Sequence, residues 1–189
     1  MIPHPETLSR PRSLLLVIDV QERINGVMAH QGHVSRLEAL IDGFRSLHLP
    51  IVATEQYPKG LGPTLPSLAQ KLPAQALEKA TFSCLREPEV TAAIEATRAR
   101  QVVVVGIETH VCVAQTALDL IRAGFQVHVP HDAVNSRRTQ DREWALKRLS
   151  IAGAVMTSTE SVLFELLERC STEDFRAVSK LVRALPVEG

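Results

Sequence analysis

Three side chains of complementary chemistry, Asp19, Lys79 and Cys112, stand out in the sequence. Asp19 follows an apolar run typical of a buried strand, and a buried carboxylate is costly unless it has a partner or a task. A cysteine thiol can act as a nucleophile, a carboxylate can accept its proton, and an ammonium group can stabilise the resulting negative charges. Spacing alone leaves a second interpretation open: a loop-capping aspartate, a solvated lysine and a thiol packed in the core.

The sequence around Cys112 favours a functional role for this thiol. Four consecutive valines end at Gly106, a pattern typical of a strand buried on both faces of a parallel sheet. Apolar residues at helical spacing follow, so we expect a helix with Thr109 as its N-cap and Cys112 in its first turn. The partial positive charge at a helix start should lower the pKa of the thiol and favour the thiolate.

Strand patterns alternate with helix patterns along the chain. Strands are expected at residues 13–20, 51–54, 102–105, 125–130 and 154–157, helices at residues 33–47, 88–100, 139–152, 158–169 and 172–185, and residues 76–82 are ambiguous. The alternation predicts an α/β fold, a three-layer α/β/α sandwich with a mainly parallel, roughly six-stranded doubly wound sheet. Because the carboxyl ends of strands face one crevice in such a sheet, Asp19, Lys79 and Cys112 could meet there.

Length and charge limit the kinds of protein that the chain can be. Its 189 residues predict one domain over residues 1–189, in which the proline-rich residues 1–12 form an extended N-terminal arm. Lysine and arginine together number 21, as do aspartate and glutamate, so the formal net charge is zero. This balance argues against nucleic acid or an anionic membrane as a partner. It also offers little resistance to self-association, so we expect a homo-oligomer, a dimer or larger.

The sequence favours a cytoplasmic location. Its three cysteines are widely spaced and include no CxxC pair, which is typical of a reducing compartment. Residues 1–12 contain no apolar segment of the kind that directs secretion, and the apolar run at residues 14–20 is too short to span a bilayer.

Four segments carry a resemblance to a known family. They are LLVIDVQE at residues 15–22, LEKATFS at residues 77–83, GIETHVCV at residues 106–113 and QTALDLIRAGFQVHVPHDAVNSR at residues 115–137. In these segments the chain resembles the isochorismatase-like cysteine hydrolases, whose order it follows over most of residues 13–165. The resemblance implies a catalytic triad of Asp19, Lys79 and Cys112. It also implies a cis peptide between Ile107 and Glu108, which turns the backbone N–H groups of Glu108 and Cys112 toward an oxyanion.

One loop indicates a branch of that family and argues against a metal. The stretch TEQYPKGLGPTLP at residues 54–66 resembles the isochorismatase domain-containing proteins. It differs from the nicotinamidase branch, where this loop supplies an aspartate and two histidines to a metal, because Glu55 is its only carboxylate. His30 and His33 have a spacing that metal ligands can adopt, but no carboxylate or cysteine partner is evident. We therefore expect no metal and no cofactor.

The resemblance implies hydrolysis of a small molecule at an amide or related C–N bond through a thioester on Cys112. Relatives that cleave a vinyl ether generally lack this cysteine, so its presence favours acyl chemistry. Gln21, Tyr57, Phe82 and His110 are the candidates for substrate binding. Two alternatives remain open: a scaffold or interaction protein on the same fold with little turnover, and a metal-assisted nicotinamidase.

Overall fold

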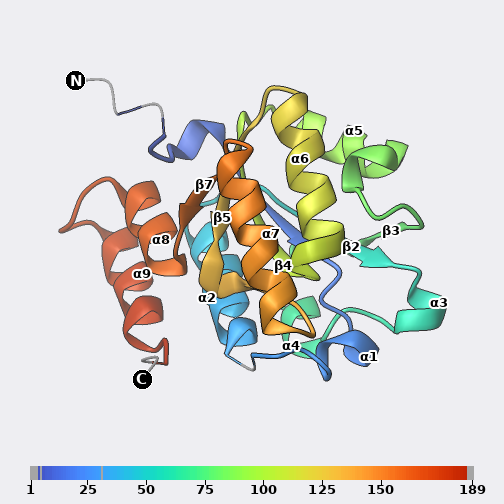
Figure 1. Ribbon diagram of the computed structural model, residues 1–189. Helices are drawn as coiled ribbons and strands as arrows, with labels where there is room; N and C mark the ends of the chain where they lie inside the picture. The colour runs from blue at the N-terminus through green and yellow to red at the C-terminus, as the bar shows by residue number, and fades with distance from the viewer. Residues whose placement is uncertain (1–3, 5, 31, 187–189) are drawn as a thin grey trace.

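The computed structural model describes residue 4 and residues 6–30 and 32–186. A parallel β-sheet forms the centre of the molecule, and helices cover both of its faces (Figure 1). The fold class expected from the alternating strand and helix patterns is therefore confirmed.

The sheet has seven strands. They are β1 (Ser13–Ile18), β2 (Ile51–Gln56), β3 (Leu77–Lys79), β4 (Gln101–Ile107), β5 (Gln126–Pro130), β6 (Val134–Asn135) and β7 (Val155–Thr157). Their order across the sheet is β3-β2-β1-β4-β5-β7, and β6 pairs with the end of β4. The sequence predicts roughly six strands because β6 has two residues, too few to leave a periodic pattern.

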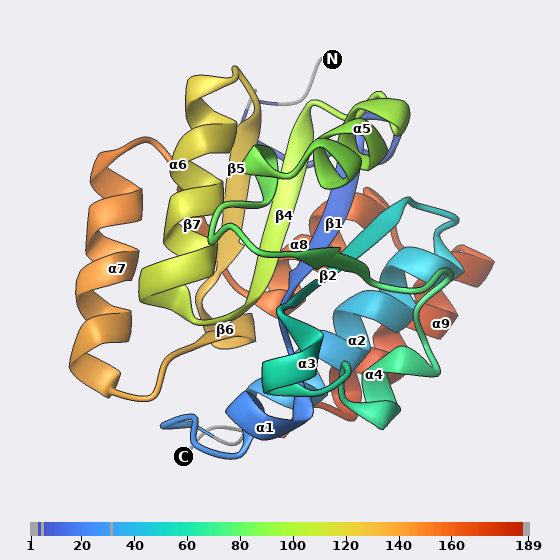
Figure 2. The ribbon, with the colours of Figure 1, turned by 90° about the vertical axis from the view of Figure 1, so that its right-hand side faces the viewer.

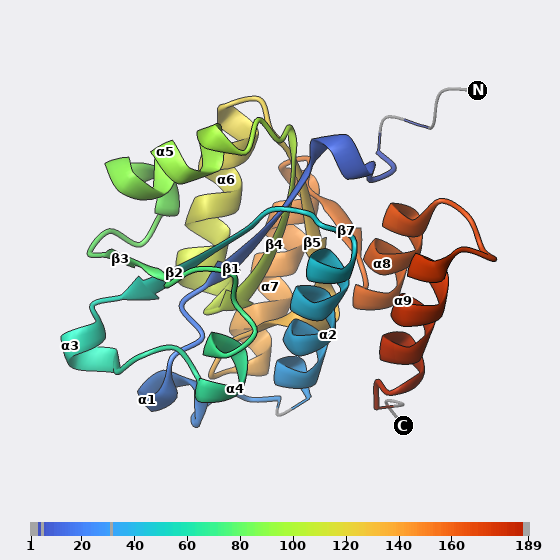
Figure 3. The same cartoon turned by 180° about the vertical axis from the view of Figure 1, so that it is seen from behind.

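Nine α-helices surround the sheet within the described residues. They are α1 (Glu22–Asn25), α2 (His33–Ser46), α3 (Pro58–Leu61), α4 (Pro66–Ala69), α5 (Pro88–Ala96), α6 (Ala114–Arg122), α7 (Thr139–Ile151), α8 (Thr159–Leu167) and α9 (Glu173–Arg183). Figure 2 shows α6 and α7 on one side of the sheet and α2, α4 and α9 on the other. Viewed from behind, α8 lies beside α9, and α1, α3 and α4 gather at one end of the sheet (Figure 3).

Side chains on the two faces of β1 pack in two separate hydrophobic clusters. Leu15 and Val17 pack in the cluster that includes side chains from α2, α8 and α9, whereas Leu14, Leu16 and Ile18 pack in the cluster beneath α5, α6 and α7. Each of these strand residues is at most 1% exposed. This burial on both faces explains why the strand is continuously apolar, and it fixes the position of the residue that follows it.

The described part of the N-terminal arm is attached to the body of the protein. Leu8 is buried, and its backbone N–H donates to the Glu165 carboxylate at 2.9 Å. Arg10–Arg12 form a short 3₁₀ helix immediately before β1. The expectation of an extended arm is therefore wrong at its end nearest the sheet, and its residues 1–3 and 5 lie outside the described residues.

His128 on β5 makes the stability of the fold sensitive to acid. Its side chain is fully buried, neither ring nitrogen has a hydrogen-bond partner among the described residues, and burial lowers its pKa from 6.5 to about 4. Between these two pKa values the unfolded chain binds a proton that the folded chain does not. The free energy of unfolding therefore falls as the pH drops through this window.

Replacing His128 by leucine should remove this sensitivity. From pH 7 to pH 5 we expect the parent protein to lose about 2 kcal/mol more unfolding free energy than His128→Leu. Urea unfolding at the two pH values measures the difference, and His4→Leu, which alters an exposed histidine, is the control. The same pH dependence in the parent protein and in His128→Leu would contradict a neutral, buried His128.

Candidate active site

The predicted site lies where the strand order of the sheet reverses. From β1 the chain proceeds to β2 on one side, and from β4 it proceeds to β5 on the other. Ligands of doubly wound proteins bind at such a switch point, outside the carboxyl ends of the strands. Asp19 directly follows β1, and Cys112 lies five residues beyond the end of β4. Gln56 and Lys79 are the last residues of β2 and β3 and pair with each other in the sheet.

Gly106 allows the two central strands to approach each other at this point. It pairs with Ile18 in the β1–β4 ladder and has a φ of +111°. A Cβ atom at this position would lie 2.1 Å from the Ile18 carbonyl oxygen. A residue other than glycine would therefore displace the backbone that leads directly into Asp19.

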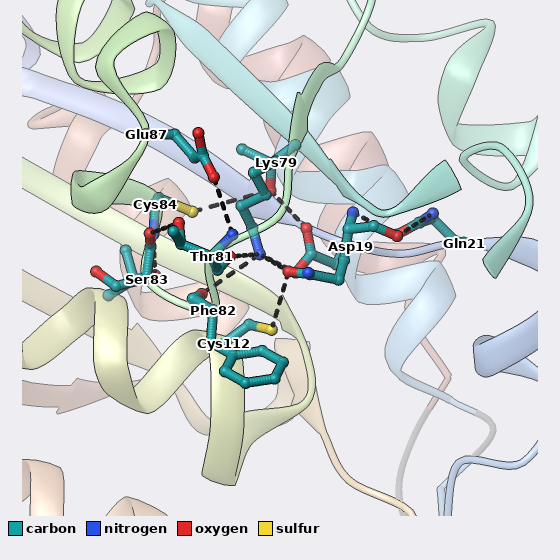
Figure 4. Close-up of polar contacts among 12 residues, drawn as sticks. Asp19, Gln21, Lys79, Thr81, Phe82, Ser83, Cys84, Glu87 and Cys112 are labelled. Carbon is teal, nitrogen blue, oxygen red and sulfur yellow. Dashed lines mark hydrogen bonds and ion pairs between the residues drawn. The ribbon is translucent and has the colours of Figure 1, made fainter. Parts of the chain in front are cut away.

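Asp19 and Lys79 form a buried ion pair, with Lys79 Nζ 2.7 Å from Asp19 Oδ2 (Figure 4). Thr54 Oγ1 donates to the other carboxylate oxygen at 2.8 Å. Burial raises the pKa of Asp19, and the opposing effects of Lys79 and Thr54 do not cancel this rise. A carboxylate held in this way is a better proton acceptor than an exposed one.

The Lys79 ammonium group is surrounded by acceptors besides Asp19. Nζ donates to Gln56 Oε1 at 2.5 Å and to the carbonyl oxygens of Thr81 and Phe82 at 3.1 and 3.3 Å. Burial alone would lower the pKa of Lys79, but the Asp19 carboxylate outweighs it and the pKa is raised. Lys79 is therefore positively charged and is not available as a general base.

Cys112 lies in a π-helical turn, Thr109–Val113, that precedes α6. The prediction of Thr109 as an N-cap is wrong: Thr109 lies inside this turn, and its buried hydroxyl has no partner among the described residues. The Cys112 side chain lies 4.0 Å from Gln56 Oε1, measured at Sγ, and the residue is 6% exposed. A wider helical turn leaves no pattern that differs from an α-helix in sequence.

The predicted lowering of the Cys112 pKa is also wrong. Burial raises the pKa of this thiol, and the neighbouring Asp19 carboxylate raises it further, against the opposing charge of Lys79. The resting residue is thus a protonated thiol beside a carboxylate, so it needs a base before it can act as a nucleophile.

The backbone before Cys112 has the geometry that the resemblance implies. The Ile107–Glu108 peptide is cis. The buried Glu108 carboxylate accepts from the backbone N–H of Arg137 at 3.2 Å and from its Nε at 3.0 Å, and the Glu108 carbonyl accepts from Val111 and Val113. The side chain and carbonyl of Glu108 are therefore committed within the chain, and its N–H remains the predicted oxyanion donor.

The four candidates for substrate binding differ in how exposed they are and in which groups they contact. Gln21 is fully buried, accepts from the Gln56 N–H at 2.8 Å and donates to the carbonyls of Gln56 and Gly62 at 3.1 and 2.6 Å. Its amide therefore holds the chain segments around the site together, and its role in substrate binding stays a prediction. His110 contacts Ser136 Oγ at 3.0 Å. Tyr57 and Phe82 are exposed.

Gln56 is the site residue that the sequence interpretation missed. It contacts both Lys79 and Cys112 through Oε1, yet the predicted strand ended two residues earlier, at Thr54. The strand continues because Thr54, Glu55 and Gln56 pair with β3. Gln56 could have been found only from the pairing of β2 with β3. With three residues, β3 is too short to be recognised as a strand from its sequence.

Glu87 fixes the loop that supplies two of the acceptors around Lys79. Its Oε1 accepts from the backbone N–H groups of Ala80 and Thr81, both at 2.9 Å, and these bonds lower the pKa of Glu87 (Figure 4). Glu87→Ala should leave both donors without this acceptor, so we expect hydrogen exchange of residues 80–82 to accelerate about tenfold.

Glu87→Gln should exchange at nearly the parent rate, since its amide oxygen can still accept both bonds. Glu89→Ala, an exposed glutamate on α5, is the control for loss of a nearby charge. Mass spectrometry of the peptide that contains residues 80–82 measures the rates. Unchanged exchange in Glu87→Ala would remove Glu87 from this role.

Two further findings concern metal-binding clusters and membrane-spanning helices. Within residue 4 and residues 6–30 and 32–186, no group of three or more histidine, cysteine or acidic side chains is arranged to hold a metal ion. No helix in the same part of the chain is long and apolar enough to cross a membrane.

The fold and the site together define the class: a doubly wound α/β/α protein that brings an Asp–Lys ion pair and a thiol together at the switch point of its sheet. Residues 13–161 match the family model described as Isochorismatase domain. The chain belongs to the isochorismatase family, and the resemblance found in its motifs is confirmed.

Three similar proteins illustrate the family. The chain is 39% identical to isochorismatase domain-containing protein 1 of Danio rerio over 93% of its own length and 62% of that protein's. The structure of MAR1 ribonuclease from Caenorhabditis elegans is 36% identical, with a TM-score of 0.90 over 97% of this chain and 96% of that one. The YcaC gene product of Escherichia coli, described as an octameric hydrolase of unknown specificity, is 26% identical, with a TM-score of 0.89 over 96% and 91% of the two chains.

Proposed function

We propose that the chain is a cysteine hydrolase that cleaves an amide or related C–N bond in a small molecule. The observation that carries this proposal is the buried Asp19–Lys79 ion pair, 2.7 Å between Nζ and Oδ2, next to the Cys112 thiol. Nucleophile, proton acceptor and charge-stabilising cation are the three parts that covalent catalysis by a thiol requires. The hydrolase class agrees with the family to which the chain belongs.

Asp19 acts as the general base in the first half of the reaction. It takes the proton of Cys112 as the sulfur attacks the substrate carbonyl carbon. A free thiolate is then never formed, which matters because the pKa of this thiol is raised. The carbonyl oxygen becomes an oxyanion and accepts from the N–H groups of Glu108 and Cys112. A positioned donor of this kind contributes about 3–4 kcal/mol to transition-state stabilisation. Asp19 then gives its proton to the leaving amine as the C–N bond breaks, which leaves a thioester on Cys112.

Water completes the cycle. Asp19, again ionised, takes a proton from a water molecule that attacks the thioester carbonyl. The carbon–sulfur bond breaks, the acid product leaves, and the proton returns from Asp19 to Cys112. Lys79 stabilises the carboxylate and the developing negative charge throughout, because its raised pKa keeps it protonated.

RNA cleavage is the alternative substrate class, because three similar solved structures are described as ribonucleases, two of them as putative. We favour a small molecule because the proposed nucleophile is only 6% exposed and the formal net charge of the chain is zero. Affinity for RNA backbones normally rests on several phosphate contacts from lysine and arginine. RNA cleavage that is lost in Cys112→Ala would replace the small-molecule proposal.

A screen of small amides and ureas for release of ammonia or amine tests the proposed function. Parent protein and Cys112→Ala are assayed side by side, and release that requires Cys112 is the expected result. Absence of Cys112-dependent release across the panel, together with absence of RNA cleavage, would favour the scaffold alternative with little turnover.

Activity should not depend on a divalent metal. A zinc-type site needs about three protein ligands from histidine, cysteine or carboxylate side chains. Glu55, the only carboxylate in residues 54–66, is already the acceptor for the Thr64 N–H and hydroxyl, both at 2.6 Å. We expect turnover to be unchanged after treatment with chelator and little activity on nicotinamide. Activity lost on chelation and restored by zinc, iron or manganese would favour a metal-assisted nicotinamidase over the proposed function.

We also propose that the protein is a homo-oligomer and works in the cytoplasm. The E. coli relative is described as octameric, and a formal net charge of zero permits self-association. Light scattering coupled to gel filtration should give a mass that is a multiple of 20.8 kDa. A mass of one chain at micromolar concentration would contradict the oligomer.

A further inference from the structure

The orientation of the Gln56 amide is fixed by contacts on both of its ends. Oε1 accepts from the Lys79 ammonium group at 2.5 Å, and Nε2 donates to the Ala80 carbonyl oxygen at 2.8 Å. If the amide were turned over, its NH₂ group would face an ammonium group and its oxygen would face a carbonyl oxygen. Both contacts would then be repulsive, so the oxygen must lie on the Lys79 side.

The backbone of Gln56 is held equally firmly. Gln21 Oε1 accepts from the Gln56 N–H at 2.8 Å, and Gln21 Nε2 donates to the Gln56 carbonyl at 3.1 Å. Gln21 is fully buried, and Gln56 itself pairs with Lys79 where β2 meets β3. Main chain and side chain of Gln56 are therefore both fixed before any substrate binds, as a specificity-determining group requires.

The fixed oxygen faces the proposed nucleophile. Gln56 Oε1 is 4.0 Å from Cys112 Sγ, and the thiol is the donor in this weak contact. An amide oxygen has two lone pairs, of which one is taken by Lys79. When Asp19 removes the thiol proton, the second lone pair loses its donor and faces a negatively charged sulfur. A hydrogen-bond donor on the substrate would then be favoured at this position.

We propose that Gln56 Oε1 accepts an N–H from the substrate and makes the site selective for amides and ureas over esters. In a productive complex the reacting carbon lies about 3–3.5 Å from the sulfur, and the amide nitrogen is one bond further on. An acceptor 4.0 Å from the same sulfur is at a similar distance from it as that nitrogen, so a substrate oriented toward Gln56 can donate its N–H to Oε1. An ester places an oxygen without a proton there, which leaves the acceptor unpaired. This inference rests on the proposed function and names its substrate class.

Two alkylating reagents test the inference without a known substrate. Iodoacetamide carries an amide NH₂ close to its reacting carbon, and methyl iodoacetate carries an ester in the same place. With either reagent a bond forms between Cys112 Sγ and the CH₂ carbon, the C–I bond breaks, iodide leaves with the electron pair, and Asp19 receives the thiol proton. The exposed Cys170 is first replaced by serine so that it does not consume reagent.

The measured quantity is the ratio of the two Cys112 labelling rates, iodoacetamide over methyl iodoacetate, divided by the same ratio for glutathione. Peptide mass spectrometry gives the rates. Gln56→Met removes the acceptor at similar side-chain volume, Gln56→Glu keeps an acceptor oxygen, and Gln70→Met changes an exposed glutamine as the matched control. Any general effect of losing the Lys79 contact slows both reagents and cancels in the ratio.

We expect the normalised ratio to fall about three- to tenfold in Gln56→Met, the size of one neutral hydrogen bond, and to stay near the parent value in Gln56→Glu and Gln70→Met. A ratio in Gln56→Met within twofold of the parent, or an equal fall in Gln56→Glu, would overturn the inference while leaving the proposed function intact. Failure of both reagents to label Cys112 in the folded parent protein would instead contradict the proposed function itself, and with it the inference.

Discussion

Cys112→Ala should lower turnover of a substrate found by screening by about 10,000-fold or more, because the proposed thioester forms on this thiol. Removal of a covalent nucleophile from a set of residues that act together typically eliminates most of the rate acceleration. Initial rates at saturating and at low substrate separate the effect on kcat from that on KM, and we expect KM to change little.

Two other cysteines supply the controls for this substitution. Cys170→Ala changes an exposed thiol and should leave the rate unchanged. Cys84 is fully buried, with its sulfur 3.9 Å from Thr54 Oγ1, and burial raises its pKa to about 11, so it is expected to pack and not to react. Full activity in Cys112→Ala would mean direct attack by water, as in the relatives that hydrolyse a vinyl ether.

Lys79→Met should have the second largest effect, and it should act on rate, pH dependence and stability together. Loss of the cation removes the stabilisation of the developing negative charge, so kcat/KM should fall by about 100-fold or more. Lys79 opposes the rise in the pKa of Asp19, so its loss should raise that pKa further. The acid limb of the pH–rate profile, where Asp19 takes up a proton and stops acting as a base, should therefore move to higher pH.

The buried ion pair also predicts a loss of folding stability in this variant. Removing one partner leaves the Asp19 carboxylate buried without its counter-ion, which typically costs about 3–5 kcal/mol. Lys71→Met breaks the partly exposed pair with Asp42, 2.5 Å between Nζ and Oδ2, and should cost less than about 1 kcal/mol. An unchanged acid limb in Lys79→Met, or equal destabilisation by the two substitutions, would contradict the assigned role of Lys79.

The sequence predicted the fold and the elements of the site because buried parallel strands leave long apolar runs. The β-branched run in β4 and the apolar run in β1 both proved to be central strands, and their carboxyl ends meet at the switch point. The ion pair between Asp19 and Lys79, which are 60 positions apart, follows from that topology. Helix ends could be placed only within a few residues, since each depends on local capping.

The details that decide the chemistry could not be obtained in this way. A thiol's pKa depends on how much water surrounds it and on which charges face it, and Cys112 proved to be buried beside a carboxylate. The position of Gln56 depends on a strand pairing between segments more than 20 residues apart. The hydrogen bonds of the Gln21 amide could not be predicted either, because their partners are backbone groups of Gln56 and Gly62, which are distant in sequence.

The central claim is that Cys112 carries the acyl group of the substrate during turnover. Rapid-quench mass spectrometry with a slowly turned-over amide measures this most directly, by following the intact protein and the peptide that contains Cys112 through the first turnover. We expect a mass increase equal to the acyl portion of the substrate, located on Cys112, that forms and decays at rates consistent with turnover and is absent in Cys112→Ala. Release of a full equivalent of product while Cys112 stays unmodified at every quench time would contradict the claim.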